Sequence, residues 1–378
     1  MGEDKDDPYK AAGVNYAAMD PFKRACMEAA LATAEHLRGL SMTELAWTRG
    51  ESAYVVMLSS GDHLGMVIEG LGTKSCVADA LYALTGRVFD DRVALCNAAM
   101  VLNDLATLGA DPAVFLLKVD AGDDAWFENE ARVSAFIRGT RSACDQVGCS
   151  WGGGETATLP DVVVPGALVF SGSAFGPIAR ERDIINPKRI HEGDRIILLG
   201  SSGPHANGFS LARRKMNLQL PGDYLKSLPD GTAYGEALLA PTFLYGPTLT
   251  ALRRAGIQIC YAMNVTGHGW RKLMRAVYDH TYVIERIPEP QPVFDFIQSH
   301  GVNADGSVGL SDEKMYGTFN MGAGFALIVP PDDAERAVEI AQGCGVPALD
   351  AGFVEVGPRR VVIRPKNLIF EGSTLAVR

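Results

Sequence analysis

The chain has 378 residues, 47% of them hydrophobic and 21% charged, which is the balance of a soluble globular protein. This length suits two domains or one large one. The formal net charge is −10 and the basic residues are dispersed, which argues against a nucleic-acid partner. No apolar run approaches the ~18 residues of a membrane span. The acidic residues 1–7 do not resemble a secretory signal. We therefore expect a cytoplasmic protein without a membrane partner.

Strands and helices alternate in the first half of the chain. We expect a helix over residues 20–38, with Asp20 as its N-cap and Pro21 at its first position. Two strands joined by a Ser-Ser-Gly-Asp turn follow it. A long apolar helix, which we expect to be buried, and further alternating elements complete this half. The expected strands are 54–58, 64–69, 114–119 and 167–176, and the expected helices are 91–108 and 126–147.

The charged stretch 177–193 contains Pro187 and is interpreted as a connection between domains. It divides the chain into an N-terminal domain, residues 1–186, and a C-terminal domain, residues 187–378. Strands and helices mix in both halves, which predicts an α+β protein of two α/β-type domains. The later elements are expected strands at 194–200, 324–329 and 360–363 and a helix at 331–342.

Two glycine-rich stretches are the most informative segments. Residues 152–157 read GGGETA, and residues 201–210 read SSGPHANGFS. Each follows a strand-like segment, and the second leads into an expected helix. Glycine allows close approach to an anion, and the N–H groups at a helix start favour negative charge. Neither stretch matches the P-loop or the dinucleotide fingerprint. Both are phosphate-binding candidates, and a turn with a purely structural role remains an equal alternative.

Three acidic residues stand at loop or helix positions that suit a cation. Glu69 closes an expected strand, Asp104 lies in an apolar helix, and Glu155 follows three glycines. Mg²⁺ prefers one or two carboxylates together with substrate phosphates. Lys74 offers a positive charge to a phosphate. The structural alternatives are a buried carboxylate paired with a cation for Asp104 and a helix N-cap in a turn for Glu155.

Two histidines lie in glycine-rich surroundings. His205 follows Pro204 in the second glycine stretch, and His268 lies between Gly267 and Gly269. Sparse local packing favours exposure toward a ligand, although a structural or merely exposed histidine is the more common case. The motifs of nucleophilic hydrolases, zinc proteases and thiol pairs are absent, and the seven scattered cysteines are interpreted as reduced thiols.

Seven segments in collinear order resemble the phosphoribosylformylglycinamidine cyclo-ligase (aminoimidazole ribonucleotide synthetase) family. The segment SSGPHANGFSLAR is close to diagnostic of that family. The seven segments cover nearly the whole chain: residues 9–14, 70–74, 103–105, 152–157, 200–210, 265–267 and 315–322.

The resemblance implies a two-domain chain that forms a homodimer, with strands of two N-terminal domains closing a barrel. It implies ATP and Mg²⁺ as cofactors and a small phosphorylated ribonucleotide, formylglycinamidine ribonucleotide, as substrate. Phosphoryl activation of the formyl amide oxygen precedes closure of the imidazole ring in such enzymes. The alternatives are a relative that uses ATP and Mg²⁺ on another amide, amidine or small acid, and a nucleotide-binding regulator without turnover.

The resemblance also assigns roles to residues of this chain. Metal ligands would be Glu69, Asp104 and Glu155, and catalytic residues would be His205, Asn207 and His268. The nucleotide would contact Gly70, Gly72, Thr73, Lys74, Asn103, Asp104, Gly153, Gly154, Glu155, Thr156 and Gly203.

Four departures from the family pattern indicate a divergent member. Glu69 replaces the usual aspartate, and Thr158 replaces a second glutamate. Asn264 stands where the family has histidine, and His268 appears four residues later. Residues 50–54 read GESAY where the family has a Gly-Phe-Gly element. We expect His268 to take over the role of the missing histidine in proton transfer, since an unperturbed imidazole pKa of ~6.5 suits that role.

Overall fold

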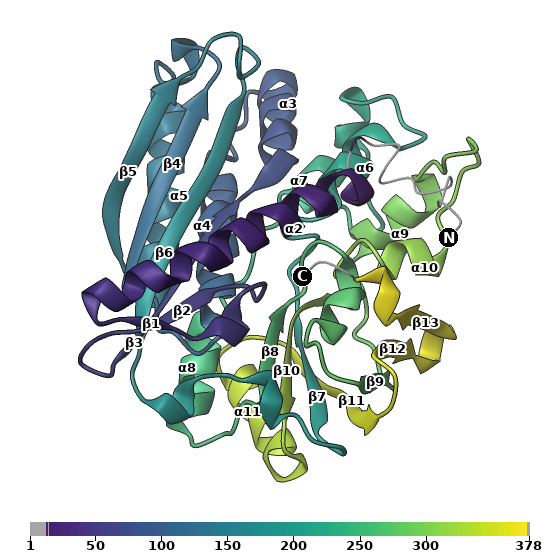
Figure 1. Cartoon of the computed structure of the whole chain (residues 1–378). Helices are drawn as coiled ribbons and strands as arrows, with labels where there is room; N and C mark the ends of the chain where they lie inside the picture. The colour runs from purple at the N-terminus through teal and green to yellow at the C-terminus, as the bar shows by residue number, and fades with distance from the viewer. Residues whose placement is uncertain (1–12, 14, 376–378) are drawn as a thin grey trace.

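Two β-sheets, each with its own helices, organise the protein (Figure 1). The computed structural model describes residues 13 and 15–375, and of Tyr16 and Ala17 only the backbone. Most of the segment 9–14 used above therefore lies outside the described residues. The first sheet has the strand order β1-β2-β3-β6-β4-β5. Its strands are β1 (Thr43–Glu44), β2 (Tyr54–Met57), β3 (His63–Gly70), β4 (Val114–Ala121), β5 (Ser150–Thr158) and β6 (Leu168–Ile178).

Three helices lie on one face of the first sheet: α3 (Ser75–Thr85), α4 (Asp90–Ala106) and α5 (Glu130–Val147). The expected burial of the apolar helix is confirmed, since nearly all of α4 from Val93 onward is buried. It packs against both β3 and β6. Close packing requires a small residue, because a Cβ on Gly65 would lie 2.9 Å from the Ala110 side chain. The same Cβ would lie 3.3 Å from the Leu105 side chain of α4, so the absence of a side chain at Gly65 lets α4 lie close to β3.

The opposite face of the first sheet exposes apolar side chains. Ile68 is 75% exposed, and Val169, Phe175 and Leu116 are also exposed. Their cross-strand registers place all four on the face that α4 does not cover. Large exposed apolar patches on soluble proteins usually mark interaction surfaces.

The first helix begins earlier than the sequence predicts. α2 spans Tyr16–Thr33, with Asn15 as N-cap, and a 3-10 helix continues over Ala34–Leu40. Asp20 is therefore not the N-cap, and Pro21 lies inside the helix. A proline inside a helix removes one hydrogen bond, but its φ is already helical. Figure 1 shows α2 running across the front of the molecule.

The GGGET segment is a strand, and the prediction of a turn there was wrong. Residues Ser150–Thr158 form edge strand β5, parallel to β4, with a register shift opposite Phe115 and Leu117. The glycines are needed for close approach: a Cβ on Gly154 would lie 1.8 Å from the Leu117 carbonyl oxygen. Glycine in a strand often marks such an irregularity or close backbone approach, which explains the turn-like composition.

The second sheet has the order β13-β12-β9-β11-β7-β10-β8. Its strand β10 and, after Arg195, its strand β7 are apolar and buried, as expected for strands covered on both faces. Its strands are β7 (Arg195–Gly200), β8 (Tyr261–Asn264), β9 (His280–Ile284), β10 (Ala323–Val329), β11 (Ala348–Val356), β12 (Arg360–Ile363) and β13 (Leu368–Glu371). The helices of this half are α6 (Phe209–Arg214), α7 (Tyr234–Leu238), α8 (Gly246–Arg254), α9 (Pro292–His300), α10 (Asp312–Tyr316) and α11 (Ala334–Gly343).

The predicted mixture of strands and helices in both halves is confirmed. The predicted strands at 54–58, 64–69, 114–119, 167–176, 194–200, 324–329 and 360–363 are all present, with ends that differ by a few residues. Within the described part of the chain, no helix combines the length and apolarity needed to cross a membrane.

Candidate functional site

A cavity of about 1240 Å³ lies where α2, the first sheet and the C-terminal half meet. Residues of α2, of the segment 48–54, of β3 and of β6 form its walls, and Asp104 reaches it from α4. The C-terminal half contributes Gly267, His268, Lys272 and Arg275. Its size exceeds that of many small-molecule sites, which span about 300–1,000 Å³. The cavity is therefore large enough for a nucleotide together with a second ligand.

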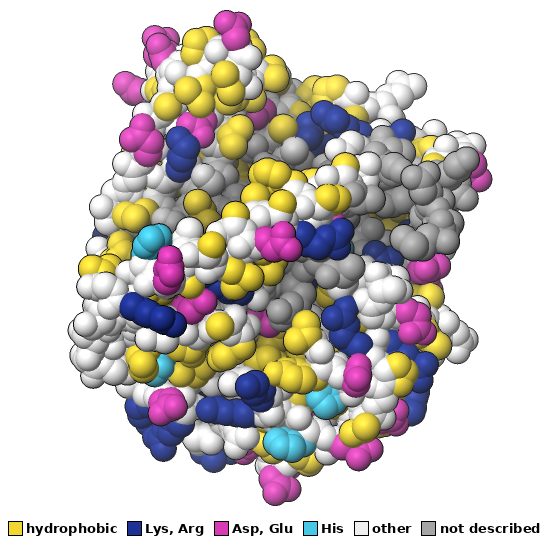
Figure 2. Space-filling view, viewed as in Figure 1, with side chains coloured by type: hydrophobic (Ala, Val, Ile, Leu, Met, Phe, Trp, Pro, Cys, Tyr) yellow, Lys and Arg dark blue, Asp and Glu magenta, His cyan; other side chains and the backbone are white. Residues whose placement is uncertain are grey.

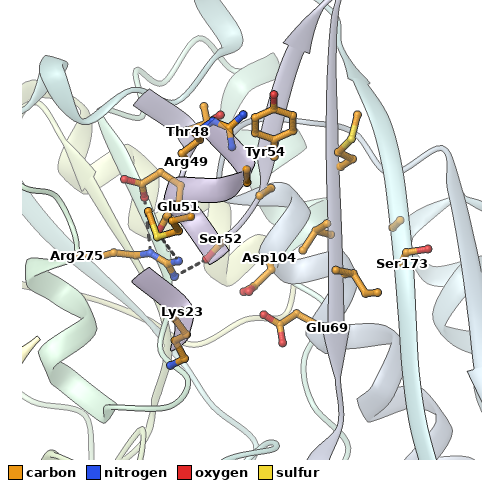
Figure 3. Close-up of a pocket in the computed structure, with 18 of the residues that line it drawn as sticks. Lys23, Thr48, Arg49, Glu51, Ser52, Tyr54, Glu69, Asp104, Ser173 and Arg275 are labelled. Atoms are coloured by element: carbon orange, nitrogen blue, oxygen red, sulfur yellow. Dashed lines mark hydrogen bonds and ion pairs between the residues drawn. The ribbon is translucent and has the colours of Figure 1, made fainter. Parts of the chain in front are cut away.

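Two carboxylates face each other in this cavity. Figure 3 shows the side chains of Glu69, from β3, and Asp104, from α4, turned toward one another. Burial, and then the charge of Asp104, raises the pKa of Glu69 to about 7. Burial also raises the pKa of Asp104, while Lys272 and Arg275 oppose that shift. Asn264 donates a hydrogen bond of 2.7 Å to Asp104 Oδ1. Placing two acids this close is unfavourable unless positive charge compensates them.

Lys272 and Arg275 supply positive charge at the same site. Lys272 lies in a 3-10 helix, Gly269–Met274, and Arg275 follows directly. Burial, and then the charge of Arg275, lowers the pKa of Lys272 to about 8, while Asp104 and Glu69 oppose that shift. Arg275 is held in place: Nη1 donates to Ser52 Oγ at 2.8 Å and Nη2 to the Gly50 carbonyl at 2.9 Å. The cavity thus combines paired carboxylates with two cationic groups.

The segment that departs from the family near residue 50 forms one wall of the cavity. Glu51 has a side chain only 2% exposed, and its Oε2 lies 3.7 Å from Arg275 Nε. The same oxygen accepts a hydrogen bond from the Tyr261 hydroxyl at 2.6 Å. Figure 3 shows Glu51 and Ser52 on either side of the Arg275 guanidinium. This wall therefore sets the orientation of Arg275.

His268 lines the cavity, but its protonation differs from the expectation. It has a positive φ of 74° and precedes Gly269, where a Cβ would lie 2.2 Å from the Tyr316 carbonyl oxygen. Burial, followed by the charges of Lys272 and Arg271, lowers the pKa of His268 to about 3. The assumed pKa of ~6.5 is therefore wrong, because a partly buried imidazole beside four basic groups resists protonation. The ring is neutral near pH 7.

Lys74 and His205 form a separate, buried group of residues. The Lys74 side chain is 0% exposed, and its ammonium donates to the carbonyls of His205 and Ala240, each at 2.8 Å. His205 Nε2 accepts a hydrogen bond from the Ser202 amide, and burial lowers the pKa of this ring to about 3. Neither residue lines the cavity. In this structure Lys74 joins the two halves of the chain and does not face an open site.

Three other predicted residues also lie in the packing between segments. Asn103 donates to the Phe243 carbonyl and accepts from the Tyr245 amide, each at 2.8 Å. The Gly203 carbonyl accepts from Asn320 at 2.8 Å. The Asn207 side-chain nitrogen is buried without a hydrogen-bond partner. Asn103 therefore joins α4 to the segment before α8, and both N–H groups of the Asn207 amide are unused.

The other predicted nucleotide contacts lie at the ends of strands or along β5. Gly70 ends β3, and Gly72 and Thr73 belong to the 3-10 helix Gly72–Lys74. Gly153, Gly154, Glu155 and Thr156 lie on exposed β5. Glu155 lies opposite Lys118, which in turn lies opposite Ser171 of β6, whereas Glu69 lies opposite the next residue of β6. The side chains of Glu155 and Glu69 are therefore on opposite faces of the sheet. One chain therefore brings Glu69 and Asp104 together but not Glu155. Among residues 13 and 15–375, no group of three His, Cys, Asp or Glu side chains could hold a metal ion.

The donor set at Glu69 and Asp104 nevertheless fits Mg²⁺. This cation is commonly held by one or two carboxylates, with waters and substrate phosphates completing its shell. Two facing carboxylates with raised pKa values supply that number of ligands. A divalent cation would compensate their repulsion more directly than the basic groups do.

Sequence reasoning missed four important residues of the cavity: Glu51, Ser52, Lys272 and Arg275. A signal for the basic pair was present. Lys272 and Arg275 are three positions apart, directly after the Gly267-His268-Gly269 turn, and this spacing puts side chains on one face of a helical turn. Glu51 and Ser52 lay in the segment noted only as a departure from the family.

Comparisons with known proteins agree with this architecture. Residues 50–178 match the N-terminal domain, and residues 191–364 the C-terminal domain, of the family described as AIR synthase related protein. The chain is similar to a phosphoribosylformylglycinamidine cyclo-ligase from Methanocaldococcus jannaschii, with 32% identity over 82% of this chain and 84% of the relative.

Solved structures show the same fold at lower identity. T. maritima PurL complexed with FGAR aligns with a TM-score of 0.58 and 16% identity, over 91% of this chain and 50% of that one. T. maritima PurL complexed with AMPPCP aligns with a TM-score of 0.54 and 14% identity, over 83% and 44%. With both domains matched in order and a relative above 30% identity over most of both chains, this chain belongs to the phosphoribosylformylglycinamidine cyclo-ligase (AIR synthase related) family.

Proposed function

We propose that the protein is an ATP-dependent cyclo-ligase that converts formylglycinamidine ribonucleotide to aminoimidazole ribonucleotide. The observation that carries this proposal is the cavity in which Glu69 and Asp104 face Lys272 and Arg275. It has the volume for a nucleotide and a second ligand, and it holds both signs of charge. The name of the M. jannaschii relative and the AMPPCP complex of PurL support the reaction and the nucleotide.

The basic and the acidic residues of the cavity would have different roles. Lys272 and Arg275 would bind phosphate oxygens of ATP and of the transferred phosphoryl group, where preorganised positive charge stabilises the transition state. Glu69 and Asp104 would hold Mg²⁺, which would neutralise charge on the polyphosphate when bound. Neutral His268 would orient the substrate by a hydrogen bond, since a ring with a pKa of about 3 is not present as the imidazolium acid near pH 7.

The proposed reaction has two steps, phosphoryl transfer and ring closure. ATP transfers its terminal phosphoryl group to the formyl amide oxygen and leaves as ADP. An amidine-side nitrogen then attacks the activated carbon, and the C–O bond to the phosphorylated oxygen breaks to release phosphate. The attacking nitrogen and the former formyl amide nitrogen each lose one proton, and these protons pass to the phosphate and to solvent. Exclusion of water from a partly enclosed cavity protects the activated intermediate from hydrolysis.

We also propose that the chain acts as a homodimer through the open face of the first sheet, and that the domains divide near residues 186 and 187. The exposed Ile68, Leu116 and Val169 support the dimer, because a second copy would cover them. In one chain, Glu155 lies on that same open face. Light scattering of the wild type should give twice the chain mass, and Val169→Asp should shift it toward the monomer. A monomeric wild type would contradict the dimer.

The experiment that tests the reaction uses purified full-length protein with ATP, Mg²⁺ and formylglycinamidine ribonucleotide, assayed for aminoimidazole. Aminoimidazole formation that requires ATP is the expected result. ADP release with another amide substrate, without aminoimidazole, would overturn the specific reaction.

A second candidate keeps the nucleotide but changes the acceptor. The hydrogen bond between Asn264 and Asp104 favours it, because Asn264 stands where the family has histidine. An amide at this point cannot take up a proton as an imidazole can. The corresponding function is ATP-dependent activation of a different amide, amidine or small acid in the same cavity.

A further inference from the structure

A second cavity, of about 520 Å³, lies at the connection between the two sheets. Residues 180–189 form one side, and the end of α8 with residues 256–259 forms the other. It shares no lining residue with the cavity at Glu69 and Asp104. Its volume falls within the range of small-molecule sites, about 300–1,000 Å³.

The lining of this second cavity is strongly basic. One lining carboxylate, Asp183, accompanies five arginines, which leaves a formal charge of +4 in a chain whose net charge is −10. Asp183 is already engaged, because Arg180 donates to it at 2.7 and 3.0 Å. Figure 2 shows Lys and Arg side chains gathered at the lower left, where Figure 1 draws α8. The five arginines are Arg180, Arg182, Arg189, Arg253 and Arg254.

Three of these arginines keep unused donors. The Arg253 side chain is only 9% exposed, and its Nε is buried without a hydrogen-bond partner. Its Nη atoms bind the Gly109 carbonyl and Asp111, each at 2.5 Å. A buried donor without a partner is costly, about 1–3 kcal/mol. The guanidinium groups of Arg182 and Arg254 have no hydrogen bond or ion pair within residues 13 and 15–375.

The helix dipole does not account for this concentration of charge. Basic residues in the last turn of a helix interact favourably with its carbonyl end, which explains Arg253 and Arg254 at the end of α8. It does not explain Arg182 and Arg189, which come from the connecting segment and lie on the opposite wall. Guanidinium groups from two chain segments, converging on one cavity, are the arrangement that recognises phosphate.

The walls also include a small apolar surface. Ile185, Ile257 and Ile259 line the cavity and are themselves nearly fully buried. An apolar wall next to several guanidinium groups suits a ligand with a phosphate chain at one end and an apolar ring at the other.

We propose that this second cavity is a binding site for a compound with two or more linked phosphate groups. Arg182 and Arg254 would contact the outer phosphates, and Arg253 Nε would donate to an oxygen of the inner one. The shared chemistry is the polyphosphate chain, either inorganic or carried by a nucleoside. This site is independent of the proposed reaction in the first cavity.

The test measures binding of inorganic tripolyphosphate to the full chain by titration calorimetry, in metal-free buffer at fixed ionic strength. The variant Arg182→Ala/Arg254→Ala removes two exposed side chains without internal partners, so we expect it to fold. The matched control, Arg138→Ala/Arg336→Ala, removes two exposed arginines from α5 and α11. Thermal unfolding of all three proteins checks their folding.

We expect the wild type and the control to bind tripolyphosphate equally, and the Arg182/Arg254 variant to bind it roughly tenfold more weakly or worse, as expected for charged hydrogen bonds. Absence of binding to the wild type would overturn the proposal. Equal affinity in the wild type and the Arg182/Arg254 variant, or an equal loss in the control, would do so as well.

A competition experiment distinguishes a nucleotide from inorganic polyphosphate as the ligand. ATP and AMP are titrated against bound tripolyphosphate in the same buffer. If ATP competes more strongly than tripolyphosphate itself, the ligand is a nucleotide; if it competes equally or less, the phosphate chain alone is recognised. AMP should compete poorly in both cases, and AMP that competes as well as ATP would contradict a site for linked phosphates.

Discussion

The cavity at Glu69 and Asp104 and the buried group at Lys74 and His205 both contain motif residues, yet they satisfy their charges differently. Lys74 gives its ammonium hydrogens to two backbone carbonyls and has no exposed surface. Glu69 and Asp104 instead face each other across open volume, with raised pKa values. Unsatisfied charge beside a cavity points to a ligand, whereas satisfied charge inside the protein points to a structural role.

The largest expected effect is a loss of catalytic activity when a carboxylate of the cavity is replaced. Asp104→Asn should lower aminoimidazole formation about 10²-fold or more, because a neutral amide compensates less phosphate and metal charge. Steady-state turnover at saturating Mg²⁺ is the measurement. Asp145→Asn, on the exposed surface of α5, is the matched control and should behave as the wild type. Wild-type turnover in Asp104→Asn would remove this carboxylate from the site.

The next effect concerns stability in the buried region. Lys74→Met should destabilise the protein by about 2–4 kcal/mol, since it leaves the buried carbonyls of His205 and Ala240 without their donor. Urea unfolding of the variant and of Lys188→Met, an exposed control, measures the difference. A Lys74→Met protein as stable as the control would show that these hydrogen bonds contribute nothing.

A third prediction concerns pH and the carboxylate pair in metal-free protein. A carboxyl whose folded pKa is raised binds its proton more tightly when folded, so its contribution to stability is complete below about pH 4.5 and is lost as pH rises to about 7. Glu69→Gln should therefore be more stable than the wild type at pH 8, by at most about 3 kcal/mol. The two proteins should converge toward pH 4.5. A difference that does not change between pH 4.5 and 8 would contradict the raised pKa.

The smallest effect concerns His268. Because its pKa is lowered to about 3, the ring stays neutral between pH 6 and 9. His268→Ala should lower turnover by removing a hydrogen bond, while the shape of the pH profile stays that of the wild type. Loss of a titration step near pH 6.5 in the variant would restore the original expectation that His268 transfers a proton.

Much of the fold was predictable, because the spacing of apolar residues and the composition of each segment match how that segment packs in the structure. The apolar run of α4 marks a buried helix, and the short apolar runs of β7 and β10 mark buried strands. β5 was not predictable from its own residues. Its glycines permit close contact with β4. In the sequence alone, glycines needed for such a contact look the same as glycines of a turn.

The site was predictable only in part, for a similar reason. Glu69 and Asp104 lie in recognisable motifs, and the packing of α4 against β3 brings them together. Arg275 reaches the cavity through contacts with Ser52 and Gly50, more than 200 residues away in sequence. Pairings between such distant segments leave no local signal. The same limit applies to Lys74, whose partners come from the second half of the chain.

The most direct measurement compares ATP affinity in Lys272→Met and Lys74→Met, in the presence of Mg²⁺ and under conditions where both variants are folded. If the open cavity holds the nucleotide phosphates, Lys272→Met should weaken ATP binding roughly tenfold or more. Lys74→Met should then bind ATP as the wild type does. The reverse result, with ATP binding lost in Lys74→Met and kept in Lys272→Met, would contradict the assignment of the site to the cavity.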